Sequence, residues 1–329
     1  MAMDKSAASS YIYAKACALI SKSFIGENSS KLFQAKSLQE LWSLLFSDEI
    51  PAIPEKLLAK EIEACAQSKF ISDFLKLVSY YSDPEPVLIT LLQDFEYTNL
   101  KHVASALCFG QKECPDLVDV HQYSIFKWEC WPDLNHIVDV QGFENLKKVP
   151  PVKELAAYEN CLDKKYIFNV LSAIKKIGGE CEAALRDLFI EKFQIENIVW
   201  ALRLKWIYKF KDEKIIDFLV FDKNSKNTSD LIGGDALKIL TFSEDDLADF
   251  SKSKIKKFLN PKDENGLWKV DAEYIFNAYK AQEWKKAKRL FHQHIETCCP
   301  LVCWYLLKQN ELDNIRRACE TLRLGCLEE

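Results

Sequence analysis

Apolar residues recur every three or four positions along most of the chain, a spacing that predicts amphipathic helices. Residues 10–24 and 55–81 each carry such an apolar stripe. Another stripe begins at Leu38, and Ser37 together with Glu40 forms the capping-box pattern that marks a helix start. We therefore expect an all-α fold built from long helices.

Residues 111–151 differ from this pattern because they show no sustained helical period. They contain two stretches of strand-like alternation, at 117–120 and 137–140, together with several Trp, Pro and Gly residues. Helical patterning returns at Val152, is interrupted by a polar break at 222–230, and then resumes. We interpret residues 111–151 as a loop-rich insert between helical units.

The composition agrees with long helices and excludes several other classes of protein. Only 9 Gly and 10 Pro occur in 329 residues, too few for the many turns of a β-sandwich or a propeller. Apolar residues make up 48% and charged residues 28%, which is enough apolar material for a core. The 44 Lys and Arg residues against 49 Asp and Glu residues give a net charge of −5, so we expect no nucleic-acid partner.

One motif occurs three times along the sequence. Its copies are FEYTNLKHVASALCFG (95–110), FQIENIVWALRLKWIY (193–208) and NELDNIRRACETLRLG (310–325). Asn99, Asn197 and Asn314 coincide, and each precedes an apolar stripe in the manner of a helix cap, which predicts three helix starts. Gly110 and Gly325 close the first and third copies. We expect the apolar stretch before each copy to form a helix that precedes the motif.

The spacing of the copies sets the size of the repeating unit. The three Asn residues lie 98 and 117 residues apart, so the unit is longer than the ~34 to ~47 residues of tetratricopeptide or HEAT repeats. We divide the chain into helical unit 1 (1–110), the loop-rich insert (111–151), helical unit 2 (152–230) and helical unit 3 (231–329). The alternative to a true repeat is a chance recurrence of helix-start signals.

Four stretches resemble the C-subunit family of V/A-type rotary ATPases, whose eukaryotic equivalent is the d subunit of the V-ATPase. They are YAKACALISKSFIGENSSKLFQAKSLQELWSLL, ENIVWALRLKWIYKFKDEKIIDFLV, LIGGDALKILTFSEDDLADF and NELDNIRRACETLRLGCLEE. Their order and threefold recurrence are similar to those of a divergent bacterial member. The sequence departs from the family in residues 111–151, for which we find no counterpart, and in the second copy, which lacks a closing Gly.

The resemblance implies a fold and a role. The family consists of three similar helical domains in a funnel with pseudo-threefold symmetry. Its members act as non-catalytic connectors that bind the D and F subunits of the central shaft on one side and the membrane proteolipid ring on the other. They transmit torque, and they use no cofactor and no small-molecule substrate. The resemblance therefore implies a cytoplasmic protein that is peripheral on the inner membrane as part of this complex.

Basic side chains cluster just after the repeated Asn residues. We consider them candidates for contacts with acidic groups of the shaft, and the alternative is an ordinary solvated helix face. The candidates are Arg203, Lys205, Lys209, Arg316, Arg317 and Arg323.

Other residues could form a metal, phosphate or catalytic site, but their spacing in the sequence gives weaker evidence for one. His292 and His294 stand near Cys298, Cys299 and Cys303, but no CxxC pair accompanies them and Pro300 follows Cys299, so we expect buried thiols rather than a metal site. Gly178-Gly179 and Gly233-Gly234 fit neither phosphate-binding motif. A thiol-dependent enzyme using Cys161 or Cys181 would need a His partner in space.

Two alternatives stay open at this level. The lysine-rich stretch 251–262 suits either an anionic membrane surface or the end of a helix. The principal alternative to a rotary-ATPase connector is a free-standing helical-repeat scaffold or regulatory binding protein. Lys15 interrupts the apolar stretch near the start, so we expect no signal peptide there, and no run approaches the ~18 apolar residues of a membrane span. We therefore expect the protein in a reducing cytoplasm, with mostly free thiols.

Overall fold

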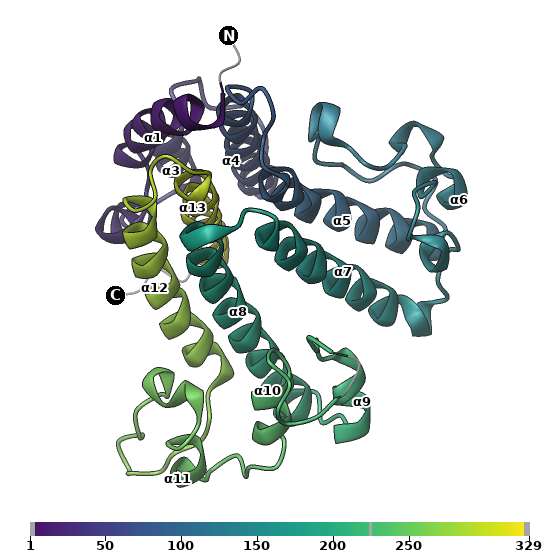
Figure 1. Ribbon diagram of the computed structural model, residues 1–329, viewed down its shortest axis with the longest axis vertical. Helices are drawn as coiled ribbons and strands as arrows, with labels where there is room; N and C mark the ends of the chain where they lie inside the picture. Colours follow the sequence, from purple (N-terminus) through teal and green to yellow (C-terminus); the bar gives the residue numbers. More distant parts are fainter. Residues whose placement is uncertain (1–3, 224–225, 326–329) are drawn as a thin grey trace. The chain divides into compact units, whose positions relative to one another are not determined.

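The computed structural model describes residues 4–223 and 226–325, and over these residues it contains helices and loops but no β-strand (Figure 1). The predicted all-α fold is confirmed. The long helices are α1 (Lys5–Ser21), α4 (Glu55–Val78), α5 (Pro86–Cys108), α7 (Leu155–Lys175), α8 (Gly179–Leu202), α12 (Ala272–Phe291) and α13 (Cys299–Leu324). The short helices are α2 (Ser30–Phe33), α3 (Leu38–Leu45), α6 (Leu134–Ile137), α9 (Asp212–Phe218), α10 (Gly234–Ile239) and α11 (Leu247–Phe250).

The chain divides into two compact units. Unit one contains residues up to Phe95, the segment Leu117–Ser124 and the residues from Lys286 onward. Unit two contains Glu96–Asp116 and Ile125–Lys285. The boundaries fall within α5 and α12, so each of these helices contributes residues to both units.

Aromatic side chains dominate the core of unit one, where α13 packs along α4 and α1. Trp304 is fully buried, and its ring stacks on that of Phe74 with centroids 6.1 Å apart. The Tyr305 ring lies 5.0 Å from that of Phe70, and its hydroxyl donates to the Leu91 carbonyl at 2.8 Å. Burial of these large rings supplies much of the apolar free energy that holds the three helices together.

The core of unit two forms around α8, which packs against α7 and α10. Ile198 on α8 and Ile275 and Tyr279 on α12 are fully buried in this core. Phe250 of the short α11 is also fully buried, with its ring 5.3 Å from that of Trp268. Single aromatic side chains therefore fix short helices and loops that have little helical propensity of their own.

The capping signal at Ser37 is confirmed. The Ser37 hydroxyl accepts a hydrogen bond from the Glu40 amide at 3.2 Å, at the start of α3. The Glu40 carboxylate accepts from the Lys36 amide at 2.8 Å. Both bonds satisfy amides near the N-terminus of α3 that have no partner within the helix. The stripe expected over 55–81 is also observed, as α4.

The prediction that Asn99, Asn197 and Asn314 mark helix starts is wrong. All three lie well inside continuous helices, α5, α8 and α13, and each apolar stretch expected as a preceding helix belongs to the same helix as its motif. Asn99 and Asn197 are buried, and Asn314 is half-buried. A polar residue before an apolar stripe looks the same in sequence whether it caps a helix or turns inward from the middle of one.

The segment 111–151 is loop-rich, as expected, but the strand-like alternation within it was misleading. Neither 117–120 nor 137–140 forms a strand. Ile137 instead ends α6, and Val120 and Val138 are fully buried as isolated apolar side chains of loops. Alternation over four residues is too short to separate a strand from a loop that buries one or two apolar side chains.

The ends of the three motif helices are built in related ways. Gly110 follows the end of α5 by two residues and Gly325 directly follows α13, and their left-handed φ values of 67° and 68° suit glycine. In the second copy, residues Arg203–Ile207 form a π-helical turn after α8, which adds one residue before the left-handed position. That position is consequently occupied by Lys209, with φ 55°, and this explains why the second copy has no closing Gly.

Candidate functional site

Each motif helix carries two polar residues, three positions apart, that turn inward. We call them the polar pairs: Glu96–Asn99 on α5, Gln194–Asn197 on α8 and Glu311–Asn314 on α13. The first member of every pair is at most 6% exposed. Buried polar groups must be hydrogen-bonded to be tolerated, so the partners of these side chains define what the motif does.

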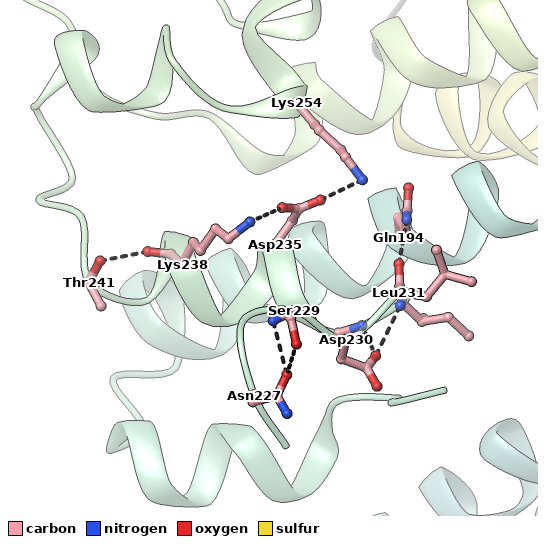
Figure 2. A network of polar contacts seen from close by, with 11 residues as sticks. Gln194, Asn227, Ser229, Asp230, Leu231, Asp235, Lys238, Thr241 and Lys254 are labelled. Carbon is pink, nitrogen blue, oxygen red and sulfur yellow. Dashed lines mark hydrogen bonds and ion pairs between the residues drawn. The ribbon is translucent and has the colours of Figure 1, made fainter. Parts of the chain in front are cut away.

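The polar pair of α8 holds two segments of the loop that follows it, and Figure 2 shows one of these contacts, between Gln194 and Leu231. The Asn197 carboxamide accepts from the Val220 amide at 2.9 Å and donates to the Val220 carbonyl at 2.7 Å. Gln194 donates to the carbonyl of Leu231. The α8 helix thus supplies the hydrogen bonds that a neighbouring β-strand would otherwise give to this extended backbone.

The same loop is tied internally by Asp230 and packed tightly through two glycines. Asp230 accepts from four backbone amides, those of Asp222, Lys223, Ile232 and Gly233, at 2.8 to 3.0 Å. A Cβ added to Gly233 would lie 2.4 Å from the Phe221 ring. The glycines of the sequence LIGG therefore permit close packing at the start of α10.

Asp230 makes the loop sensitive to acid. Burial tends to raise the pKa of its carboxyl, but the four backbone amides outweigh this and lower the pKa below its ordinary value. A carboxyl with a lowered pKa in the folded state adds stability above its unfolded pKa, and this stability is lost as the pH falls through the folded value.

We expect Asp230→Asn to lower the free energy of unfolding by about 1–2 kcal/mol at pH 7, because the amide nitrogen of Asn cannot accept from the backbone amides. The difference from the wild type should hold from pH 7 to about 4 and shrink as the pH falls from about 4 towards 2, through the lowered folded pKa, since protonation then weakens the same bonds in the wild type. Urea unfolding across this range measures it. Asp222→Asn, an exposed change in the same loop, is the control. A difference that stays constant with pH would contradict the assignment.

The polar pair of α5 binds the loop-rich segment 111–151. The Glu96 carboxylate, 1% exposed, accepts from the Ile125 amide at 2.8 Å, the Phe126 amide at 3.4 Å and the Trp128 indole nitrogen at 3.2 Å. A single buried carboxylate therefore anchors both the backbone and an aromatic side chain of this segment. Asn99, fully buried, lies one helical turn further along α5.

The polar pair of α13 binds a segment near the start of the chain. The Glu311 carboxylate accepts from the Phe24 amide at 2.6 Å, and it also pairs with Lys308. Lys308 in turn donates to the Ser23 hydroxyl at 3.3 Å. The Asn314 amide donates to Asn310 of the same helix at 3.4 Å.

The three bound segments resemble one another. Phe24, Ile125 and Leu231 each follow a Ser or Asp and precede an apolar residue. A short helix that begins with Leu after a Ser or Asp cap follows each segment: α3 after Ser37, α6 after Asp133 and α11 after Asp246. The segment 111–151, interpreted from the sequence as an insert between helical units, therefore shares its anchor and its capped short helix with the other two loops.

The basic candidates of unit two differ in how far they are free to bind a partner. Lys205 donates to a backbone carbonyl at the end of α10 and pairs with Asp212 at 3.5 Å. The Arg203 guanidinium lies 5.9 Å from the Phe276 ring and lines a groove of 540 Å³ with the acidic residues Glu244, Asp271 and Glu273. Lys209 is exposed and forms no ion pair within residues 4–223 and 226–325.

The basic candidates of unit one lie on α13. Arg316 pairs with an aspartate one helical turn earlier at 3.5 Å and lies 3.9 Å from Glu63. Arg317 lies 5.9 Å from the Phe33 ring, and Arg323 pairs with a glutamate of the same helix at 2.6 Å. All three side chains are exposed, so their ion pairs are solvent-screened and contribute little to stability.

A group of four charges, of which Glu283 is buried and Lys192, Glu196 and Lys280 are half-buried, joins α8 and α12 in unit two. Lys192 lies 2.7 Å from Glu196 and 3.6 Å from Glu283, and Lys280 pairs with Glu283 at 3.0 Å. Burial opposes the charge on Lys192, but the two glutamates raise its pKa well above the ordinary value. The i, i+4 spacing of Lys192 and Glu196 was visible in the sequence, whereas Glu283 is brought in by the tertiary fold alone.

The His and Cys residues considered for a metal do not converge. The His292 ring nitrogen Nδ1 lies 2.8 Å from the Tyr13 hydroxyl, and Cys298, Cys299 and Cys303 are buried. In the described part of the chain no group of three or more His, Cys, Asp or Glu residues is placed to hold a metal ion.

No helix among the described residues is long and apolar enough to cross a membrane. Burial raises the pKa of the Cys319 thiol to about 12.

Sequence comparisons agree with the family resemblance. A family described as "ATP synthase (C/AC39) subunit" matches residues 12–328, nearly the whole chain. A protein of Treponema pallidum (strain Nichols), named "Uncharacterized protein", is 23% identical over 333 residues, which span 99% of this chain and 95% of that protein. The chain belongs to the ATP synthase (C/AC39) subunit family and is a divergent member of the V/A-type ATPase C-subunit group.

Proposed function

We propose that this chain is the non-catalytic central-stalk connector of a V/A-type rotary ATPase. In this role it links the shaft, formed by the D and F subunits, to the membrane proteolipid ring at the cytoplasmic face of the membrane, and it transmits torque for ATP-coupled ion transport. The observation that carries the proposal is the family match over residues 12–328.

The internal construction of the helices suits the transmission of torque. A connector under load needs loops that do not yield relative to the helices they join. The polar pairs supply this by binding loop backbone at Val220, Ile125 and Phe24 from within α8, α5 and α13. Hydrogen bonds buried in this way are short-ranged and directional, so they resist sliding better than apolar contacts do.

Among the basic candidates, we propose that Arg316, Arg317 and Lys209 contact acidic groups of the shaft. Their side chains are exposed. Arg316 forms only solvent-exposed ion pairs, Arg317 lies over the Phe33 ring, and Lys209 forms no ion pair among the described residues. We leave Lys205 out of this proposal because its ammonium group is bound to the end of α10 and to Asp212.

The test is co-elution in size-exclusion chromatography of this chain with the purified D–F shaft and, separately, with the detergent-solubilised proteolipid ring of the same organism. We expect joint elution with both. The double variant Arg316→Glu/Arg317→Glu should weaken shaft binding about tenfold at low salt, with a smaller effect at high salt. Lys56→Glu/Lys60→Glu on α4, two exposed lysines, is the matched control.

The outcomes separate the proposal from its alternative. Elution apart from both components, with each of them intact, would favour the free-standing helical scaffold. Joint elution with unchanged shaft affinity of the Arg316→Glu/Arg317→Glu variant would leave the connector role in place and remove the basic residues from the interface.

A further inference from the structure

The Tyr279 hydroxyl on α12 is a buried polar group that has no hydrogen-bond partner among residues 4–223 and 226–325. Its side chain is fully buried in the core of unit two, where its ring lies 5.7 Å from that of Phe258. Packing explains an aromatic ring at this position, but a Phe would fill the same space without burying a hydroxyl. Buried polar groups in folded proteins are bonded to something, so the hydroxyl points to a partner outside the chain.

Glu283, one helical turn further along α12, supplies a second such atom. Its Oε2 accepts from Lys280 at 3.0 Å, whereas its Oε1 forms no hydrogen bond within the described part of the chain. The spacing of four residues places Tyr279 and Glu283 on one face of the helix. Burial and then the charge of Glu283 are the two main causes that raise the pKa of Tyr279, which agrees with this proximity.

Lys192 on α8 faces the same place from the neighbouring helix. Its Nζ lies 3.6 Å from Glu283 Oε1, too far for a hydrogen bond, and donates to Glu196 at 2.7 Å. An ammonium group has three N–H donors, and Glu196 takes one of them. Two atoms 3.6 Å apart can both lie about 2.8 Å from one oxygen atom, so a single small molecule can bond to Lys192 and Glu283 together.

The charges around these atoms favour a neutral ligand. Lys192 and Lys280 balance Glu196 and Glu283, so an added ion would bring an unbalanced charge into a largely buried site. Water is neutral, accepts from an ammonium group and donates to a carboxylate. Buried waters typically make about three hydrogen bonds to polar groups that the protein itself leaves unpaired.

We propose that one water molecule binds between α8 and α12, hydrogen-bonded to the Tyr279 hydroxyl, Glu283 Oε1 and the Lys192 ammonium group. The water accepts from Lys192 and from the hydroxyl, and it donates to the carboxylate, so each of the three groups gains a partner. All three residues belong to unit two. The site therefore depends neither on the placement of the two units nor on the connector function.

The test combines crystal structures with urea unfolding of the wild type and Tyr279→Phe. In the wild-type crystal we expect a water oxygen within hydrogen-bond distance of all three groups. Tyr279→Phe should raise the equilibrium constant of unfolding about fivefold, because the water and the charges that it bridges lose one partner. The control is Tyr274→Phe, a 44% exposed tyrosine of the same helix, which should change this constant less than about twofold.

Three results would overturn the inference. A wild-type crystal in which the Tyr279 hydroxyl bonds directly to Glu283, with no water between them, replaces the water by a contact within the chain. An unfolding constant that stays equal or falls in Tyr279→Phe shows that the hydroxyl is unpaired, since removal of an unpaired buried hydroxyl costs no stability. A water that bonds to Lys192 and Glu283 but not to Tyr279 removes the tyrosine from the site.

Discussion

Lys192→Met is expected to lower the free energy of unfolding by about 3–5 kcal/mol, the usual range for removing one partner of a buried ion pair. The change deletes one positive charge from a group whose two glutamates and two lysines are balanced. Glu283, only 6% exposed, is then left with Lys280 as its single cationic partner. The uncompensated buried charge, and not the lost attraction, accounts for most of the cost.

The pKa of Glu283 gives this effect a dependence on pH. Burial opposes ionisation of its carboxyl, but Lys192 and Lys280 outweigh it and lower the pKa. The ion pairs therefore stabilise the folded state above the unfolded pKa of a glutamate, and this stabilisation is lost as the pH falls through the lowered folded value. The penalty of Lys192→Met should accordingly decrease under acidic conditions, where Glu283 takes up a proton in the variant.

A second variant keeps the prediction falsifiable. Lys192→Met combined with Glu283→Leu leaves Lys280 and Glu196, a neutral and less buried set, and should recover most of the lost stability. Lys285→Met, an exposed change on α12, should alter stability by less than about 0.5 kcal/mol. Urea unfolding of the four proteins measures these differences. Equal stability of the single variant and the wild type would show that the four charges do not act as a group.

Glu96→Ala is expected to cost about 3 kcal/mol and to release the segment around Ile125, because hydrogen bonds to a charged acceptor are worth more than neutral ones. The substitution removes the acceptor of three donors at once, the Ile125 and Phe126 amides and the Trp128 indole nitrogen. Two of these three donors are backbone groups that cannot turn away to water without local unfolding.

Hydrogen exchange followed by mass spectrometry is the measurement for this change, since the effect should be local. Amides of 125–128 should exchange faster by at least about tenfold in Glu96→Ala, while those of α13 should keep their wild-type rates. Glu129→Ala, an exposed carboxylate of the same segment, is the control. Unchanged protection at Ile125 and Phe126 would show that the apolar packing of the segment suffices without Glu96.

The three polar pairs show where sequence reasoning reached its limit. Alignment of the motif copies found Asn99, Asn197 and Asn314, and the same alignment contains Glu96, Gln194 and Glu311 one helical turn earlier. The spacing of three places both members on one face of a helix, which was a usable signal. It could not reveal burial, because the segments they bind lie far away in the chain: Val220 is 23 residues from Asn197, and Phe24 is 287 residues from Glu311.

By itself, the sequence determined the features that depend on local physics. Apolar periodicity and the scarcity of Gly and Pro predicted the helices, Ser37 marked the start of α3, and the order of the motifs led to the family. Helix formation and capping involve residues within four positions of one another, so the local sequence pattern contains the information that determines them.

The tertiary structure alone decided which polar residues turn inward and what they hold. It assigned Gln194 and Asn197 to the loop after α8, Glu96 to the segment 111–151, and Glu283 to Lys192. It also placed the π-helical turn that moves the left-handed position to Lys209. These features depend on groups far apart in the chain that must find partners once packing removes them from water, a constraint that no local pattern records.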